Sequence, residues 1–309
     1  MKTLDRDTFI RLKKLRPWIS FSYIFCVYAL IFSICFIAQS LSWYFWFPLL
    51  LIVGGLQHHL MTFIHEGAHG NLLVQKKAND FWTDVLVGIP FFTLVRQYRF
   101  VHQAHHRLSG QLDDPERSMY NASGYNYNFN GKKALLVTLI KDLLGYSFVK
   151  SAVWMGGQLE KRYDMGSIAK PGSKDLPALL LCLTLLSSPV LLLQIQWSFL
   201  ILWFGGLFAA QFFLRLHGYG EHTGDLSDNQ FEVTVTHDFM FLTKFFLYPI
   251  NSHLHLEHHI YPTIPWYNLR ELRSEAMKDI EYREGAGRLT SDGYFWGRKS
   301  ILKLVFGLK

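Results

Sequence analysis

The chain has 309 residues, of which 50% are hydrophobic, 16% aromatic and 18% charged, with a formal net charge of +7. Three cysteines without CxxC spacing exclude a disulfide framework or a thiolate metal site, and the composition excludes a disordered chain. The positive charge does not indicate nucleic acid, because membrane proteins carry an excess of Lys and Arg in their cytoplasmic segments.

Two long segments without Asp, Glu, Lys or Arg predict the part that spans the membrane. They run from 17 to 65 and from 177 to 214. Each is too long for one span of about 20 residues and fits two. A short polar stretch divides each segment, which predicts two tight helical hairpins, because helices satisfy their own backbone polar groups in lipid. The expected spans lie near 18–38, 43–64, 176–193 and 197–214.

The basic residues predict the orientation of these spans. All 31 Lys and Arg lie before the first span, between the hairpins or after the fourth span. By the positive-inside rule, the cytoplasmic segments are then 1–17, 65–175 and 215–309, and both termini are cytoplasmic. The expected fold is an all-α integral membrane protein, with four transmembrane helices in two hairpins and a cytoplasmic helical cap, forming a single domain over 1–309.

Eight of the fourteen histidines fall into three short groups: HEGAH at 65–69, HQAHH at 102–106 and HLEHH at 255–259. In a helix, each group places its histidines three and four residues apart, on one face. All three groups lie on the predicted cytoplasmic side and can converge there. The predicted metal ligands are His65, His69, His102, His105, His106, His255, His258 and His259.

A ninth candidate ligand is His222, which follows the fourth span on the same side. His217 is a weaker candidate, and the other four histidines are expected to be packed residues: His58, His59, His237 and His253. A zinc site takes four ligands, so nine imidazoles are enough for two metal ions. Imidazole binds iron, zinc, copper and nickel, and the residues alone therefore leave the metal unnamed.

The three groups resemble the histidine boxes of the membrane fatty acid desaturase and hydroxylase superfamily. Further motifs agree with this resemblance: Tyr98-Arg99 before the second box, Asp114-Pro115-Glu116 after it, Asn251 before the third box, and the tail Ile260 to Pro265. The segment GYGEHTG at 218–224 is similar to the glutamate–histidine motif of membrane alkane hydroxylases. The resemblance extends from the second span to about Leu272.

Two positions depart from the family pattern. Gly110 stands where many members have Asn after the second box, and Gly218 stands where acyl-CoA desaturases have Asn before the ninth histidine. A water in place of a side chain near one metal is one interpretation. The chain has no His-Pro-Gly-Gly haem motif, so the resemblance implies that electrons come from a separate protein of ferredoxin, rubredoxin or cytochrome b5 type.

The resemblance implies a mushroom-shaped helical fold with a histidine-bound diiron centre where the spans meet the cap. Such enzymes use O2 to remove hydrogen from an unactivated C–H bond in a lipid-like chain. Fatty acid desaturation is the favoured activity, and hydroxylation or oxidation of an alkane, a carotenoid or a terminal-alkene precursor stays open. The short loops favour the bacterial inner membrane over the endoplasmic reticulum.

A metal-bound histidine usually donates its second ring N–H to a carboxylate or a carbonyl. The acids available for this role are Glu66, Glu221, Glu257, Asp113 and Asp114. HEGAH also fits the HExxH signature of zinc membrane proteases, with Glu66 as the general base, but this alternative leaves two boxes unexplained. A metal transporter would place its ligands near the middle of the membrane, where the boxes do not lie.

Overall fold

The structure is a computed structural model that describes residues 4–117, 132–146, 150, 171–223, 225–238 and 241–304. Apart from short strands and bridges, the regular elements in these residues are helices, which confirms the all-α class. Contacts divide the chain into two compact units. The first unit comprises Met1–Leu15, Val101–Val137 and Leu214–Lys309, and the second comprises Arg16–Phe100 and Thr138–Phe213.

Among these described residues, four helices are long and apolar enough to cross a membrane, as expected from the charge-free segments. They are α2 (Pro17–Ala38), α3 (Trp46–His69), α10 (Leu176–Leu192) and α11 (Trp197–Glu221). Helices α3 and α11 continue beyond the predicted ends of their spans. The HEGAH box is therefore the last turn of α3, and Glu221 is the last residue of α11.

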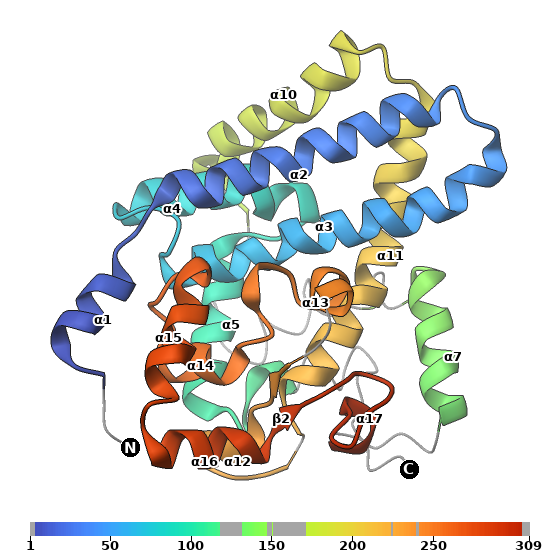
Figure 1. Cartoon of the computed structure of the whole chain (residues 1–309). Coiled ribbons are helices and arrows are strands. Elements are labelled where there is room, and N and C mark those ends of the chain that lie inside the picture. The colour runs from blue at the N-terminus through green and yellow to red at the C-terminus, as the bar shows by residue number, and fades with distance from the viewer. Residues whose placement is uncertain are drawn as a thin grey trace. The chain divides into compact units, whose positions relative to one another are not determined.

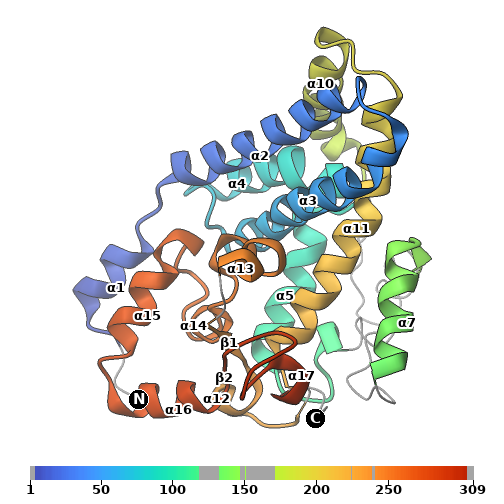
Figure 2. The same cartoon turned by 45° about the vertical axis from the view of Figure 1, so that its right-hand side comes forward.

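Helices α2 and α3 form the first hairpin of the second unit and lie side by side (Figures 1 and 2). Six of the seven buried residues of α2 recur every three or four positions and make one stripe, with Phe32 beside it: Ser20, Ile24, Val27, Ile31, Cys35 and Ala38. Residues outside this stripe face outward, as Phe25 does with 73% of its surface exposed. The turn between the helices contains η1 (Trp43–Phe45), whose three aromatic side chains are exposed.

The second predicted hairpin is joined by a short turn, but its helices pack mainly against other elements. Ala178 and Cys182 of α10 pack on Val85 and its neighbours. Helix α11 is bonded to the first hairpin, because Ser198 Oγ donates to the carbonyl of Cys35 at 2.7 Å and Gln57 Nε2 donates to the carbonyl of Trp203 at 2.8 Å. The chain therefore forms the two expected helical hairpins, but the contacts described for α10 and α11 are mainly with other elements.

The segment after α3 contains α4 (Lys76–Thr83), the π-helical η2 (Asp84–Gly88), η3 (Ile89–Phe91) and α5 (Val95–Leu108), and later α7 (Lys132–Leu143) and η5 (Ser173–Asp175). Asp84 Oδ1 accepts the N–H of Val95 at 2.6 Å and so caps the start of α5. Arg99 of α5 pairs with Asp80 and donates to the carbonyls of Gly67 and Ala68. These bonds connect the end of the HEGAH helix to α5, which carries the second box.

The first unit is built from short elements. They are α1 (Arg6–Lys13), α12 (Gln230–Val233), β1 (Thr236–His237), α13 (Phe241–Leu247), η6 (Pro249–Asn251), α14 (His255–Ile260), η7 (Trp266–Asn268), α15 (Leu269–Ala276), α16 (Ile280–Arg288), β2 (Thr290–Ser291) and α17 (Ile301–Leu304). Strands β1 and β2 are parallel, with Thr236 opposite Thr290.

Helix α14 carries the third box and has only six residues, too few to be stable in isolation. Packing holds it on two sides. Leu254, just before the helix, belongs to a cluster with Leu12, Ile264, Leu269 and Leu272. Leu256 belongs to a second cluster with Ala276, Tyr282 and Ala286. The position of the third box is therefore determined by the apolar core of the first unit.

Candidate metal centre

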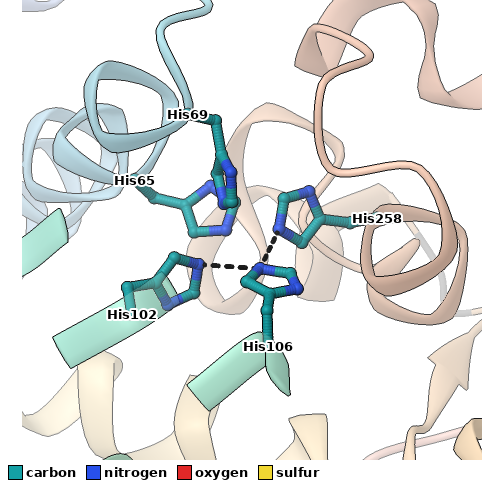
Figure 3. Close-up of side chains that lie close together, drawn as sticks. All are labelled: His65, His69, His102, His106 and His258. Carbon is teal, nitrogen blue, oxygen red and sulfur yellow. Dashed lines mark hydrogen bonds between the residues drawn. The ribbon is translucent and has the colours of Figure 1, made fainter. Parts of the chain in front are cut away.

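The first box forms the last turn of α3, in the second unit. His65 and His69 are one turn apart and their ring centroids are 4.9 Å apart (Figure 3). His65 Nδ1 lies 3.5 Å from the carboxylate of Glu66. The intervening Gly67 permits a close approach of α4, since a Cβ atom there would lie 2.3 Å from the side chain of Thr83. The helix ends at Gly70 with a φ of 77°, which suits glycine.

The second box lies on α5, and a carboxylate holds each of its two buried imidazoles. His102 Nδ1 is 2.6 Å from Glu116, and His105 Nδ1 is 2.8 Å from Asp114. A neutral histidine that donates its Nδ1 proton to a carboxylate keeps a free lone pair on Nε2. The Asp-Pro-Glu motif is therefore placed to favour the tautomers in which Nε2 can bind a metal.

Gly110 provides the turn that brings this motif back along α5. Its φ is 84°, and a Cβ atom would lie 2.1 Å from the carbonyl oxygen of Ser227. The N–H of Ser227 donates to the carbonyl of Gly110 at 3.1 Å. Backbone thus occupies the space beside this position, and the Asn found in many family members would not fit here.

Four histidines of the first unit form a group that we call the four-histidine group: His105, His222, His255 and His259. Their ligand nitrogens lie within 4.8 Å of one another, and all four residues are buried. His222 Nε2 is 3.2 Å from the Nε2 atoms of both His105 and His255, and His259 Nε2 is 3.1 Å from that of His255. Glu221 lies 3.3 Å from His255 Nδ1.

Three further histidines of the same unit form the three-histidine group: His102, His106 and His258. Their ligand nitrogens also lie within 4.8 Å of one another. His106 stands between its two neighbours, with its Nε2 atom 3.1 Å from that of His102 and 3.0 Å from that of His258 (Figure 3). The first unit thus collects seven of the nine predicted ligands, and α3 of the second unit carries His65 and His69.

The spacing of these nitrogens fits a metal ion. With metal–nitrogen bonds of about 2.1 Å, neighbouring ligands are about 3.0 Å apart at right angles and about 3.4 Å apart in a tetrahedron. The observed Nε2 separations of 3.0 to 3.2 Å lie in this range. Two lone pairs facing each other at that distance repel unless a cation lies between them. Both groups therefore have the donors and the dimensions of metal sites.

Electrostatics also favour a cation in the four-histidine group. Burial opposes positive charge on His105, but Glu116 and Asp114 outweigh burial and raise its pKa to about 9. These carboxylates favour positive charge at this place, whether a proton or a metal ion supplies it. Burial lowers the pKa of His222 to about 4, so this imidazole is neutral at pH 7, as a metal ligand must be.

The remaining histidines, among them the weaker ligand candidate His217, have other partners in the structure. His217 Nε2 lies 3.2 Å from Glu221, and His237 Nδ1 lies 2.8 Å from Ser291 Oγ. His253 is buried, and its carbonyl accepts the N–H of His237. In the second unit, the His58 ring stacks on Phe213, and His59 Nδ1 is 2.6 Å from Tyr23 Oη.

The predicted carboxylate partners are partly corrected. Asp114, Glu221 and Glu66 lie beside histidines, but Asp113 is exposed. Glu257 is buried and accepts hydrogen bonds from Thr236 Oγ1 at 2.9 Å, Tyr282 Oη at 2.7 Å and Arg273. Its place in the box could have revealed this, because position 257 is about 100° from His258 and about 200° from His255 around a helix.

Glu116 is the partner that the sequence analysis missed. It lies 2.6 Å from His102 Nδ1 and is buried. A signal was available, because Glu116 belongs to the same Asp-Pro-Glu motif as Asp114, and that motif follows the second box closely. When the chain folds back along the helix, two carboxylates that are two residues apart can each lie beside one of two histidines that are three residues apart.

Comparison with known proteins agrees with this geometry. The model of the fatty acid desaturase family matches residues 41–290. The chain is also 28% identical over 288 residues to an sn-1 acyl-lipid omega-3 desaturase (ferredoxin) of Synechocystis sp., an alignment that covers 84% of this chain and 75% of that relative. With its four apolar helices, its histidine groups and this match over most of its length, the chain is an integral membrane oxidoreductase that belongs to the fatty acid desaturase family.

Proposed function

We propose that the protein desaturates a fatty acyl chain of a membrane lipid, using O2 and electrons from a separate donor. Two iron ions would supply the activation of O2 that breaks an unactivated C–H bond. In the balanced reaction, O2 takes two hydrogens from neighbouring carbons together with two electrons and two protons, and leaves as two waters. The carbon chain gains one double bond.

The observation that carries this proposal is the pair of histidine groups in the first unit, with Nε2 atoms 3.0 to 3.2 Å apart. We assign one iron to the four-histidine group. We assign the other to the three-histidine group together with His65 and His69. The match of residues 41–290 to the fatty acid desaturase family supports this assignment, because these residues include all three boxes.

The protein's own groups would have three tasks in this reaction. Asp114 and Glu116, which lie beside Nδ1 of His105 and His102, would orient these rings so that Nε2 can bind a metal, and Glu221 would do the same for His255. Such partners fix ring orientation and raise the basicity of the ligand. The apolar helices α2, α3, α10 and α11 would give a lipid chain access from the bilayer.

The relative's name supports the finer parts of the proposal. It is an acyl-lipid desaturase with ferredoxin as its named donor. We therefore propose an acyl-lipid substrate and a ferredoxin-type donor, with rubredoxin and cytochrome b5 types as the alternatives. We further propose that both termini are cytoplasmic in a bacterial inner membrane, since the Lys and Arg residues lie outside both hairpin turns.

Hydroxylation is the second candidate activity, because the same histidine groups can serve it and only the handling of the substrate carbon decides the product. An alkane or a carotenoid would also be compatible with an apolar entry from the bilayer. A zinc protease built on His65, Glu66 and His69 would leave the seven histidines of the first unit without a role.

The test is mass spectrometry of lipids from a host that makes the protein and a matched donor. We expect acyl chains that have lost two hydrogens, and about two irons per purified chain, one for each proposed site. His105→Ala and His258→Ala should abolish the product, whereas His237→Ala controls for the loss of a buried histidine outside both groups. Acyl chains that carry a new hydroxyl group would show that the protein is a hydroxylase and not a desaturase. A purified protein that carries only zinc would exclude both the desaturase and the hydroxylase activity.

A further inference from the structure

Helix α1 has an inner face that is bound to the segment after the third box. Leu12 is buried in a cluster with Leu254, Ile264, Leu269 and Leu272, and Phe9 packs on its edge. The ring centroids of Phe9 and Tyr261 are 6.1 Å apart. Since Leu254 immediately precedes His255, one apolar cluster joins α1 to the start of the third box.

Polar contacts strengthen the attachment of α1 along its length. Asn268 Nδ2 donates to the carbonyl of Leu12 at 2.6 Å, and the N–H of Leu4 donates to Tyr261 Oη at 3.1 Å. Arg11 forms an ion pair with Glu271. A force that orders α1 would therefore also order residues 254–272, which contain three proposed metal ligands.

The outer face of α1 is a basic stripe with an apolar residue at its centre. Arg6, Ile10 and Lys13 are four and three residues apart, on one side of the helix, and all are exposed. Ile10 has 56% of its surface exposed. Lys14 and Arg16 follow, and Asp5–Arg16 contains five cations against two acids. We call Arg6, Ile10, Lys13 and Lys14 the α1 stripe.

Chain length keeps this stripe close to the bilayer. Only residues 14–16 separate α1 from α2, the first membrane-spanning helix. An extended chain covers at most about 3.6 Å per residue, so Lys13 is within about 14 Å of Pro17. The Debye length is about 10 Å at 0.1 M salt, so Lys14, at most about 11 Å from Pro17, is held within about one Debye length of the start of α2 and Lys13 only slightly further away. Trp18 is 69% exposed, as expected for an aromatic residue at the interface.

We propose that the α1 stripe binds anionic phospholipid headgroups, with Ile10 inserted between them, and that this contact orders the third histidine box. The charge of the stripe and its tether to α2 fit a negatively charged bilayer surface. A basic helix with a central apolar residue suits such an interface. The inner face of α1 then transmits the ordering to residues 254–272. The proposal does not depend on the reaction that the protein catalyses.

The experiment uses the full chain in lipid nanodiscs of phosphatidylcholine, with or without one third phosphatidylglycerol, and measures amide hydrogen exchange. We expect phosphatidylglycerol to slow exchange in residues 6–13 and 254–272 by about fivefold for each cation that engages the surface. High salt should remove the effect, because it screens exposed charges.

A matched pair of variants separates the stripe from general charge. Arg6→Gln, Lys13→Gln and Lys14→Gln together should abolish the response to phosphatidylglycerol, and glutamine preserves helix propensity. Lys278→Gln, Arg283→Gln and Arg288→Gln remove three cations elsewhere and should retain it. The proposal would be overturned if both variants lost the response to phosphatidylglycerol equally, or if phosphatidylglycerol did not slow amide exchange in the unaltered protein. Slower exchange in residues 6–13 alone would overturn the link to the third box.

Discussion

His217 and His222 are five residues apart in the chain, yet the structure gives them different surroundings. His217 lies within α11 beside Glu221, and its ring centroid is 4.9 Å from that of Tyr248. His222 follows the end of α11, where the chain pairs with Thr234 in an antiparallel bridge. This extended conformation directs His222 Nε2 to His105 and His255. The end of a helix therefore separates a proposed ligand from a packed histidine.

The first prediction compares these two histidines. His222→Ala should lower the iron content of the purified protein to about half, because one of the two proposed sites loses a central ligand. His217→Ala removes a buried imidazole from the same end of α11 and should leave the iron content unchanged. Elemental analysis of both variants, purified in parallel, measures the difference. Equal iron in the two variants would contradict the assignment of His222.

At the scale of elements, small residues determine how closely the apolar helices approach. Gly54 of α3 faces α11, where a Cβ atom would lie 2.4 Å from Ala209 Cβ and 2.7 Å from the carbonyl oxygen of Gly206. Membrane helices rely on such small residues because lipid provides no hydrophobic force between them. The bond from Gln57 to the carbonyl of Trp203 lies in the same helix pair.

The second prediction concerns this contact. Gly54→Ala should lower the stability of the second unit by about 1 to 3 kcal/mol, because the added methyl group forces α3 and α11 apart. Gly287→Ala in α16 is the control, since a Cβ atom there meets no atom within 4 Å. That change should be neutral or stabilising by about 0.5 to 1 kcal/mol. Thermal unfolding in detergent compares the variants, and equal midpoints would disprove the close contact.

The third prediction concerns η2, whose Asp84 caps α5 through the N–H of Val95. Burial raises the pKa of Asp84 from its ordinary 3.8 to about 6. Between these values the folded protein holds a proton that the unfolded chain has released. The contribution of Asp84 to the free energy of unfolding is therefore greatest below pH 3.8. It decreases as the pH rises to about 6, by about 3 kcal/mol in total.

Asp84→Asn tests this effect, because the amide oxygen can still accept the N–H of Val95 but the group does not titrate. The difference in unfolding free energy between the variant and the unaltered protein should grow in favour of the variant from pH 4 to pH 6. Taking the difference cancels the other carboxyl groups that titrate in this range. A difference that is constant with pH would show that Asp84 is not a buried, protonated acid.

At the scale of the whole molecule, the number of spans determines where the termini lie. In the part of the chain that the structure describes, four apolar helices are long enough to cross the membrane, and an even number of crossings would return the chain to the side from which it started. The distribution of Lys and Arg, which lie outside both hairpin turns, predicts that this side is the cytoplasm.

The fourth prediction is that residues near both termini react from the cytoplasmic side. Lys14→Cys and Lys303→Cys, each exposed, would be introduced singly after Cys26, Cys35 and Cys182 are replaced by serine or alanine. An impermeant maleimide should label both variants in inside-out vesicles and neither in intact spheroplasts. Labelling of the two variants from opposite sides would require an odd number of spans.

Much of this protein was predictable from local patterns. Absence of charge over 17–65 and 177–214 identified the spans, and histidines three and four residues apart identified the boxes. Both patterns follow from the geometry of a single helix, so they need no knowledge of distant contacts. The motif after the second box identified Asp114, and the same motif contains Glu116.

Tertiary structure decided which histidines share a group. His105 belongs with His222, His255 and His259, although 117 residues separate His105 from His222, whereas its neighbours His102 and His106 belong with His258. Tertiary structure also assigned Glu257 to Arg273, filled the space at Gly110 with the backbone of Ser227, and set α10 against Val85 instead of along α11. The same physical reason explains all four of these outcomes. The periodicity of a helix determines which side chains share a face, but the packing of the whole chain determines which residues that face contacts.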